Sequence, residues 1–297
     1  MRPPHPAGVR SVELGVADVA AAARFYADVW RLAPAAAQGG AAWLRGSGPA
    51  HHLLGLHPRA RPALLSLDLA AADRATVEAL YERARGAGAD ARPPAALAEP
   101  GGGYAFAMRD PEGRALRVVA DDAAQPPLPD PADRPRKITH VVLNTPRQEE
   151  AARFWCEALG FVVSDRSRLT FLRCNADHHS VAFHPGERAT LHHIAFEMDD
   201  LDAVMRGAGR LRRRGHPVEW GIGRHGPGNN VFAYFVGPEG FVIEYTAEVQ
   251  QVDDAYRPRA PGAWAYPPGV TDLWGLTPPP SARMLEAQDR IAFAPDG

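Results

Sequence analysis

An internal repeat constrains the fold of this chain more than any other feature of its sequence. The segments VADVAAAARFYADVWRL (16–32) and TPRQEEAARFWCEALGF (145–161) both carry apolar residues at the spacing of one helix face. Matching positions lie 129 residues apart. Later in each half, MRDPEGRALRVVAD (108–121) matches FVGPEGFVIEYTAE (235–248) at an offset of 127 residues. Each of these later segments predicts two strands joined by a Pro-x-Gly turn. The helical stripes consist of Ala22, Phe25, Tyr26, Val29 and Trp30 in the first half, and of Ala151, Phe154, Trp155, Ala158 and Leu159 in the second.

Between these markers, each half contains a further strand followed by a further helix. The strand ALLSLDL (63–69) precedes one apolar stripe, and HHIAFEM (192–198) precedes another. A period near 128 residues is too long for a solenoid and indicates two duplicated domains. The second stripes consist of Val77, Leu80, Tyr81 and Ala84, and of Leu201, Val204, Met205 and Ala208.

The repeat also sets the expected domain boundaries. We predict a first domain over 1–122, a linker rich in Pro and Asp over 123–136, and a second domain over 137–250. A Pro-rich C-terminal extension follows over 251–297. It contains Trp264, Tyr266 and Trp274, and these aromatic residues predict that it packs on the domains, because disordered tails are poor in them.

Composition excludes several functional classes. The formal net charge of −2 gives no electrostatic basis for binding nucleic acid. No apolar run reaches the roughly 18 residues that a membrane span requires, and MRPPHPAGVR (1–10) lacks the apolar core of a secretion signal. Cys156 and Cys174 do not form a CxxC pair. We therefore expect a cytoplasmic protein with reduced thiols.

A polar set appears only in the second half, although both halves build the same elements. Side chains alternate between the two faces of a strand. His140, His193 and Glu244 each stand on a predicted strand, and His193 should face away from the apolar side that His192 shares. The matching positions of the first half hold Ser11, Ser66 and Arg117. The fold does not require the His, His, Glu set, which therefore indicates a function.

Two histidines and one carboxylate are typical of non-heme Fe(II) sites that leave coordination positions open for oxygen chemistry. Zinc accepts the same ligand types. The three residues are far apart in the sequence, so their spacing alone leaves the choice of metal open.

Five segments together resemble the type I extradiol ring-cleavage dioxygenases of the vicinal oxygen chelate superfamily. They are ITHVVLNT, RCNADHHSVAF, LHHIAFEM, GRHGPGNNVFAYF and GPEGFVIEY. The resemblance covers most of residues 1–250 and is strongest in the second half. It implies an α+β fold of two tandem domains, each made of paired βαβββ modules whose mixed sheets curl around a central cavity. It also implies that only the C-terminal domain binds metal.

The same resemblance implies roles for individual residues. His140, His193 and Glu244 would ligate Fe(II), with Mn(II) as the other metal to consider. His179 matches the acid–base histidine of that family. His225 and Tyr234 match residues that contact substrate and oxygen. The implied reaction is the cleavage of a catechol-type diol by O2 beside its two hydroxyl groups, in the degradation of aromatic compounds by a homo-oligomeric enzyme.

We expect the remaining histidines to have structural roles. His192 is expected in the core or at the domain interface, because it alternates with apolar residues. His178 is expected beside the site but turned away from it, and His184, which precedes Pro185, at the surface. We expect no functional role for the three histidines of the metal-free half, which are His51, His52 and His57.

Two other functions remain open within the same superfamily. A glyoxalase-like isomerase or lyase would also use a metal, commonly held between two equivalent domains. A non-catalytic small-molecule-binding protein would keep the fold and lose the ligands.

Within the dioxygenase interpretation, a valine at position 142 resembles the pattern of the branch that cleaves biphenyl-type diols. Arg224 is the only arginine in VEWGIGRHG (218–226), which favours an uncharged diol.

Overall fold

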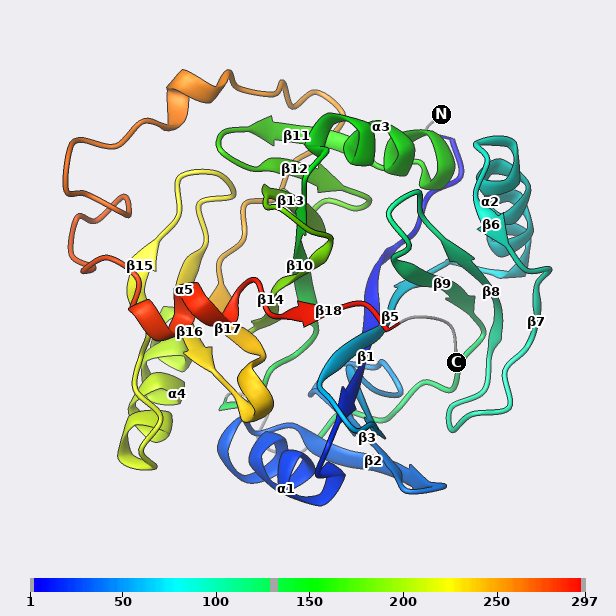
Figure 1. Ribbon diagram of the computed structural model, residues 1–297, viewed down its shortest axis with the longest axis horizontal. Helices are drawn as coiled ribbons and strands as arrows, with labels where there is room; N and C mark the ends of the chain where they lie inside the picture. The colour runs from blue at the N-terminus through cyan, green and yellow to red at the C-terminus, as the bar shows by residue number, and fades with distance from the viewer. Residues whose placement is uncertain (1–2, 129–132, 295–297) are drawn as a thin grey trace.

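The computed structural model describes residues 3–128 and 133–294, and it contains two nine-stranded mixed sheets, one in each half of the chain (Figure 1). The first sheet has the order β2-β3-β4-β1-β5-β9-β8-β6, with β7 paired to β8. The second has the order β11-β12-β13-β10-β14-β17-β16-β15, with β18 paired to β14. The two orders are equivalent strand by strand, which confirms the tandem duplication that the repeat predicts.

The elements of the first half are β1 (Gly8–Val16), α1 (Val19–Arg24), η1 (Phe25–Val29), β2 (Ala33–Gln38), β3 (Ala41–Arg45), β4 (Leu54–Pro58), β5 (Ala63–Ala70), α2 (Arg74–Gly86), β6 (Asp90–Ala91), β7 (Ala95–Ala96), β8 (Tyr104–Arg109) and β9 (Ala115–Ala120). Those of the second half are β10 (Ile138–Thr145), α3 (Gln148–Leu159), β11 (Val162–Arg166), β12 (Thr170–Arg173), β13 (Val181–Pro185), β14 (Thr190–Glu197), α4 (Leu201–Arg213), β15 (Trp220–Arg224), β16 (Val231–Val236), η3 (Pro238–Gly240) and β17 (Val242–Ala247). The extension adds η4 (Pro261–Trp264), α5 (Ala282–Ala287) and β18 (Ile291–Ala292).

Each half consists of two βαβββ modules, as expected. The modules meet along one antiparallel strand pair, β1 with β5 in the first half and β10 with β14 in the second. Within each module the first strand pairs in parallel with the last, as β10 does with β13 and β14 with β17. Parallel and antiparallel pairing in one sheet makes it mixed and confirms the α+β class.

Local sequence signals explain where the helices begin and end. The helices α1, α2 and α4 each begin after an aspartate whose carboxylate accepts from the backbone of the first turn, as Asp18 does from Ala21 N at 2.8 Å. The helix α3 ends at Gly160, whose φ of 71° is the left-handed conformation that glycine tolerates. All five apolar residues of the α3 stripe are buried, as predicted.

Two details differ from the predicted helices. The first helix continues from α1 into the π-helical segment η1, which still buries Tyr26 and leads to a buried Trp30. Met205 is 50% exposed and does not belong to the buried face of α4. The buried face of α4 instead includes Gly207, where a Cβ atom would lie only 2.7 Å from the Tyr245 ring. The buried residues of α4 are Ala203, Val204, Gly207, Ala208 and Leu211.

The two halves share one apolar core, and Trp30 lies at its centre. Its ring stacks on Tyr245 at 3.7 Å between centroids with 14° between planes. It also meets the edges of Phe196 and Phe235. The Tyr245 hydroxyl donates to the Trp30 carbonyl at 2.7 Å. A helix of the first half therefore packs directly on the sheet of the second half.

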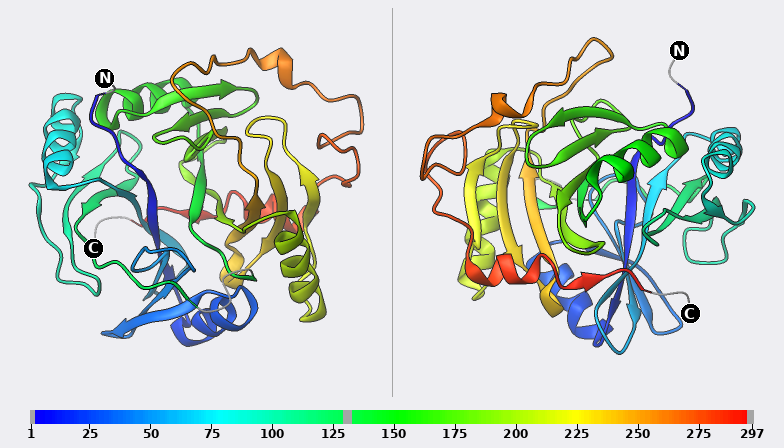
Figure 2. Two further views of the ribbon diagram at one scale, coloured as in Figure 1. Left: turned by 180° about the vertical axis from the view of Figure 1, so that it is seen from behind. Right: turned by 45° about the horizontal axis from the view of Figure 1, so that its top comes forward.

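The extension packs on the second domain, as its aromatic residues predict (Figure 2). Trp264 and Tyr266 are half-buried, and the Tyr266 hydroxyl accepts from Gly226 N at 2.7 Å. Trp274 is 37% exposed and lies over Arg224, 5.0 Å from ring centroid to guanidinium carbon. The strand β18 then returns to β14. The domain boundaries expected from the sequence remain predictions, and residues 129–132 of the expected linker lie outside the described residues.

None of the helices in the described part of the chain is long and apolar enough to cross a membrane.

We expect Trp30→Ala to lower the free energy of unfolding by about 3–5 kcal/mol, because it removes a fully buried aromatic side chain from the core shared by both halves. Denaturant unfolding followed by circular dichroism measures the loss. Leu276→Ala is the control, since Leu276 is 77% exposed and its removal should change the free energy of unfolding by less than about 0.5 kcal/mol. Equal losses in both variants would contradict this view of the core.

Candidate metal and catalytic site

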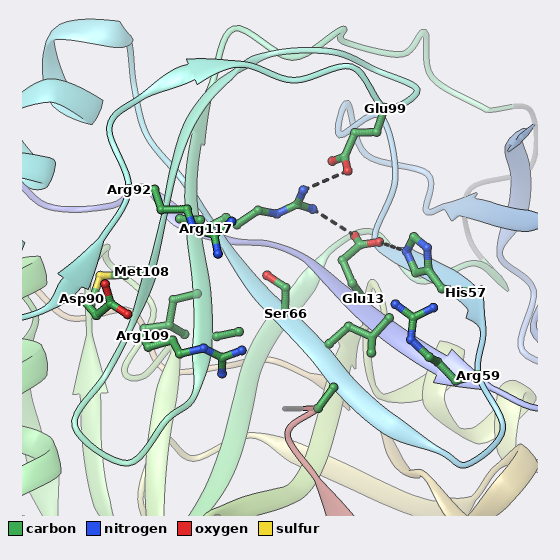
Figure 3. A pocket seen from close by; sticks show the side chains of 15 residues that line it. Glu13, His57, Arg59, Ser66, Asp90, Arg92, Glu99, Met108, Arg109 and Arg117 are labelled. Carbon is green, nitrogen blue, oxygen red and sulfur yellow. Dashed lines mark hydrogen bonds and ion pairs between the residues drawn. The ribbon is translucent and has the colours of Figure 1, made fainter. Parts of the chain in front are cut away.

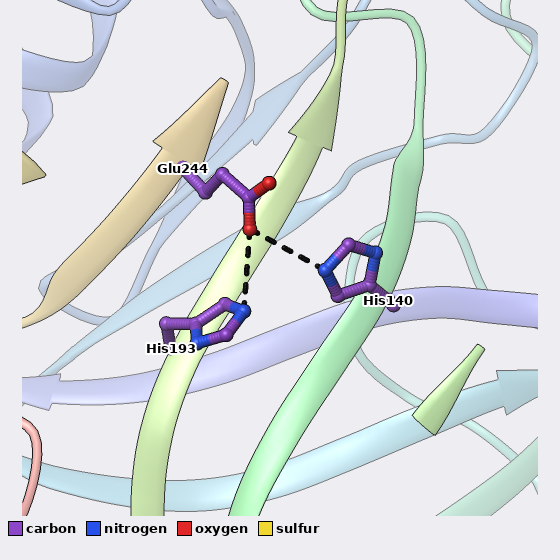
Figure 4. Close-up of side chains that lie close together, drawn as sticks. All are labelled: His140, His193 and Glu244. Carbon is purple, nitrogen blue, oxygen red and sulfur yellow. Dashed lines mark ion pairs between the residues drawn. The ribbon is translucent and has the colours of Figure 1, made fainter. Parts of the chain in front are cut away.

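Three neighbouring strands of the second sheet bring His140, His193 and Glu244 together (Figure 4). They come from β10, β14 and β17, which are adjacent in that order. His140 Nε2 lies 3.4 Å from Glu244 Oε2, and His193 Nε2 lies 3.2 Å from the same oxygen. All three residues are buried. Within the described residues this is the one group of three or more His, Cys, Asp or Glu side chains whose candidate ligand atoms converge within 4.8 Å.

The donor set fits a divalent cation. His193 Nε2 and Glu244 Oε2 are buried and have no hydrogen-bond partner among the described residues. Buried polar atoms without partners are costly, and a cation bound between them would satisfy both. Two imidazoles and one carboxylate on one side of an ion suit Fe(II), Mn(II) or Zn(II) and leave other positions open.

The electrostatic environment favours, in Glu244 and His193, the protonation states that could bind a metal. Burial opposes ionisation of Glu244, but contacts with His140 and His193 outweigh it and hold the pKa of the carboxyl well below its usual range. Burial lowers the pKa of His193, which favours the neutral imidazole. A ligating histidine must be neutral and a ligating glutamate ionised.

A β-bulge places His192 beside the ligands, so its prediction as a core or interface residue was wrong. The register of β10 and β14 pairs Val142 with His193 and then Leu143 with Leu191, which leaves His192 as an extra residue. His192 is half-buried and lines the same cavity as His193. Its Nδ1 lies 2.7 Å from His193 Nδ1, so that one ring orients the other.

His184 was also wrongly predicted, because it is half-buried and lines this cavity. Its Nδ1 lies 3.0 Å from Asn144 Oδ1, and its ring lies 4.7 Å from that of His192. Burial lowers the pKa of His184 to about 4. The strand β13 continues through Pro185, so His184 lies within a strand and its side chain is directed toward the cavity.

His179 is buried against His140 and is held by a series of hydrogen bonds. The centroid of its ring lies 4.2 Å from that of His140. Its Nδ1 lies 3.1 Å from His178 Nδ1, and His178 Nε2 lies 2.7 Å from Asp165 Oδ2. His178 thus lies beside the site and is directed toward Asp165, which confirms its predicted orientation. Gly228 leaves room for His179, since a Cβ atom there would approach the ring to 3.1 Å.

The hydrogen bonds from Asp165 through His178 fix the tautomer of His179. Burial lowers the pKa of His178, so the ring is neutral and carries one proton. The Asp165 carboxylate accepts that proton's hydrogen bond from Nε2, which leaves His178 Nδ1 as an acceptor. His179 must then donate from Nδ1, and its Nε2 keeps a free lone pair. Burial also lowers the pKa of His179 well below its usual value.

His225 and Tyr234 form a second pair at the cavity wall. His225 Nε2 lies 3.0 Å from the Tyr234 hydroxyl. Burial and then the charge of Glu244 raise the pKa of Tyr234 well above its usual value, so the hydroxyl stays protonated. Burial lowers the pKa of His225 to about 4. Both groups can therefore donate or accept hydrogen bonds without carrying charge.

The cavity that these residues line has a volume of about 610 Å³ and includes residues that sequence reasoning missed. The extension supplies part of the wall, including Tyr266, Val270, Thr271, Met284 and Leu285. Asp165, which anchors the hydrogen-bond chain, also binds the extension: it accepts from the Tyr256 hydroxyl at 2.7 Å and from Arg259 N at 2.6 Å. The aromatic residues of the extension were the one sequence signal that pointed to such packing.

Comparison with known proteins agrees with this geometry. Residues 137–245 match the Glyoxalase/Bleomycin resistance protein/Dioxygenase superfamily, and residues 11–119 match a Glyoxalase-like domain. A crystal structure of a Mn(II)-bound glyoxalase from Novosphingobium aromaticivorans is 38% identical, covers 94% of each chain and has a TM-score of 0.87. The chain therefore belongs to the Glyoxalase/Bleomycin resistance protein/Dioxygenase superfamily.

Several relatives carry the names of ring-cleavage dioxygenases. Metapyrocatechase 2 of Cupriavidus necator is 34% identical over 46% of this chain and 41% of that protein. An iron-dependent extradiol dioxygenase of Rhodococcus jostii is 32% identical over 39% of this chain and 45% of that protein. The chain thus matches less than half the length of these two relatives. A homoprotocatechuate 2,3-dioxygenase from Arthrobacter globiformis shares the fold, with a TM-score of 0.78 at 20% identity over 95% of this chain and 98% of that one.

Proposed function

We propose that the protein is an Fe(II)-dependent extradiol dioxygenase, which uses O2 to open the ring of a catechol-type diol. The observation that carries the proposal is the convergence of His193 Nε2 and Glu244 Oε2, which are buried and have no hydrogen-bond partner among the described residues, beside a cavity lined by His193 and His179. The names of the curated relatives support the same reaction. His140 completes the proposed ligand set.

The bound metal would supply positive charge that acidifies the diol and a redox centre that reacts with O2. The chain's own residues would do the rest. His179 Nε2, with its free lone pair, would take a proton from a diol hydroxyl and later return it to the oxygen that separates during ring opening. Asp165 and His178 would hold His179 in the tautomer that leaves Nε2 available.

Tyr234 and His225 would stabilise oxygen atoms that gain negative charge. The Tyr234 hydroxyl stays protonated and faces the cavity, so it can donate a hydrogen bond to such an oxygen. Both atoms of O2 would enter the product, an open-chain acid that carries an enol hydroxyl and an aldehyde or ketone (a hydroxymuconic semialdehyde from catechol), so no external reductant is needed. Enclosure by the extension would keep water away from the reacting atoms.

The lining of the cavity supports a diol with an apolar substituent. Val142, Phe171 and Val270 present apolar side chains to the space. Arg224 does not line it, because its guanidinium donates to Asn229 O at 2.6 Å and pairs with Glu248. One exposed arginine, Arg168, lies on the wall. The expected homo-oligomer stays a prediction.

The proposal is tested by loading the purified chain with Fe(II) without oxygen and then adding O2 with catechol, 3-methylcatechol or 2,3-dihydroxybiphenyl. We expect O2 uptake equal to the diol consumed and a yellow ring-opened product. Parallel loading with Mn(II) and Zn(II) identifies the metal. The absence of O2 uptake with every diol and every metal would refute the proposal.

A metal-dependent glyoxalase is the second candidate, because the Mn(II)-bound neighbour carries that name. The ligand set argues against it, since all three side chains come from one domain. The same metal-loaded samples, given the hemithioacetal of methylglyoxal and glutathione, separate the two activities. Thioester formation without O2 uptake would favour the glyoxalase.

We expect Glu244→Ala to abolish metal binding and activity together, because it removes the only carboxylate of the proposed ligand set. Metal analysis after dialysis measures this as a fall from one metal per chain to less than about a tenth, in keeping with the loss of a charged ligand. Glu13→Gln is the control, since Glu13 is a buried carboxylate of the first half. A Glu244→Ala variant that keeps its metal would show that the ligands are assigned wrongly.

His179→Ala should keep its metal and lower kcat by roughly 100- to 10,000-fold, the usual contribution of a positioned acid or base. Asp165→Asn should lower kcat less and leave the metal content near wild type, because it weakens the hydrogen bonds that hold His178 and the extension but removes no proposed ligand. Steady-state kinetics at known metal occupancy separates these effects. Metal loss in His179→Ala would instead place His179 among the ligands, and an unchanged kcat in both variants would end the acid–base assignment.

A further inference from the structure

The first domain contains a cavity of about 380 Å³ on its own sheet (Figure 3). It is lined by Ser66 and Arg117, which occupy the positions equivalent to His193 and Glu244 in the second domain. Each domain thus contains a cavity, and only the second contains the proposed metal ligands. The first cavity is not filled by apolar side chains. Four arginines line it instead: Arg59, Arg92, Arg109 and Arg117.

Arg117 has a structural role, because its guanidinium forms ion pairs within the first domain. Its Nη2 lies 2.5 Å from Asp68 Oδ2, and its Nη1 lies 2.8 Å from Glu99 Oε2. The hydroxyls of Ser11 and Ser66 donate to the same Asp68 carboxylate. The guanidinium therefore supplies the positive charge of this site, and the ion-paired cluster leaves no place for a metal among these residues.

Arg59 and Arg92 are differently placed, because neither has a carboxylate within 4.0 Å in the described part of the chain. Arg59 Nη1 donates only to the carbonyl of Pro58 at 2.9 Å. Figure 3 shows the two guanidinium groups approaching the cavity from different sides. The stem of Arg59 lies across Gly15, where a Cβ atom would be 2.7 Å from its Cγ. Glycine at that position makes room for the arginine.

The cavity also offers hydrogen-bond acceptors. Glu99 Oε1 is buried and has no hydrogen-bond partner, although Oε2 of the same carboxylate binds Arg117. Glu13 is held by His57 Nε2 at 2.7 Å and by His52 Nε2 at 3.1 Å. A Cβ atom at Gly55 would collide with the Glu13 carboxylate. His52 and His57, for which we expected no role, therefore help to build this wall.

We propose that this cavity is a second small-molecule site, which binds a small organic acid that also carries a hydroxyl group. Arg59 and Arg92 bind its carboxylate groups, and its hydroxyl donates to Glu99 Oε1. The proposal concerns the first domain alone and does not depend on the reaction at the metal site.

Charge and size select this class of ligand. Guanidinium groups recognise planar carboxylates through paired hydrogen bonds. The volume is in the range of small-ligand sites, roughly 300–1,000 Å³, and lies at its lower end. Glu13, Asp90 and Glu99 also line the cavity and repel ligands with more charge than two arginines can neutralise. Nucleotides and polyphosphates are thereby disfavoured, whereas a hydroxylated mono- or dicarboxylate fits.

Isothermal titration calorimetry of the full chain with L-malate, succinate and glycerol at low ionic strength tests the site. We expect saturable binding of one malate per chain, weaker binding of succinate, which lacks the hydroxyl, and no binding of glycerol. The double variant Arg59→Gln/Arg92→Gln should weaken malate binding by roughly 10- to 100-fold through the loss of two charge-assisted contacts. Both side chains are exposed, so the variant should fold.

Two control variants make the result specific. Arg24→Gln removes an exposed arginine of the same domain outside the cavity and should leave malate binding unchanged. Glu244→Ala disables the proposed metal site and should also leave it unchanged. Absence of saturable malate binding, equal affinity in the double variant, or loss of binding in Glu244→Ala would each overturn the proposal. Equal affinities for malate and succinate would overturn the assigned role of Glu99.

Discussion

The register of three adjacent strands is the constraint on which the site depends. In β10, β14 and β17, His140 stands opposite Ala195, and Ala195 stands opposite Glu244. A shift of one residue in any of these pairings would turn a ligand to the opposite face of the sheet. The pairing is regular from His140 with Ala195 to Val142 with His193, and the bulge at His192 interrupts it only beyond His193. Tight apolar packing on the other face, around Trp30, keeps this register fixed.

Buried charge is balanced differently in the two halves. In the second half, His140 and His193 flank the buried Glu244 carboxylate, whose Oε2 has no hydrogen-bond partner among the described residues. In the first half, the residue equivalent to Glu244 is Arg117, whose guanidinium neutralises Asp68 directly. Isolated buried charges are costly, and each half avoids that cost in its own way. The ion pairs of the first half neutralise its buried carboxylate, whereas the arrangement of the second half suits a bound cation.

Much of the fold and of the candidate site was predictable because it depends on local periodicity. The helical stripes and the set of His140, His193 and Glu244 follow from comparing one half with the other, whereas the paired βαβββ modules were implied by the family resemblance. His184 was misplaced because β13 continues through Pro185, so that His184 lies within a strand, and His192 was misplaced because of a bulge. Strict alternation of side chains holds only for regular strands, and a bulge is a long-range property of strand pairing that one strand's sequence does not reveal.

Asp165 was missed because its role arises from contacts between distant segments. It lies on β11, accepts hydrogen bonds from Tyr256 and Arg259 in the extension, and holds His178 on the loop before β13. No sequence spacing links these positions. The same extension lines the cavity through Met284 and Leu285. The segment that encloses the site is therefore also attached to the carboxylate that sets the tautomer of His179. Displacement of the extension would both admit water and release the orientation of the proposed acid–base histidine, so enclosure and proton transfer depend on one set of contacts.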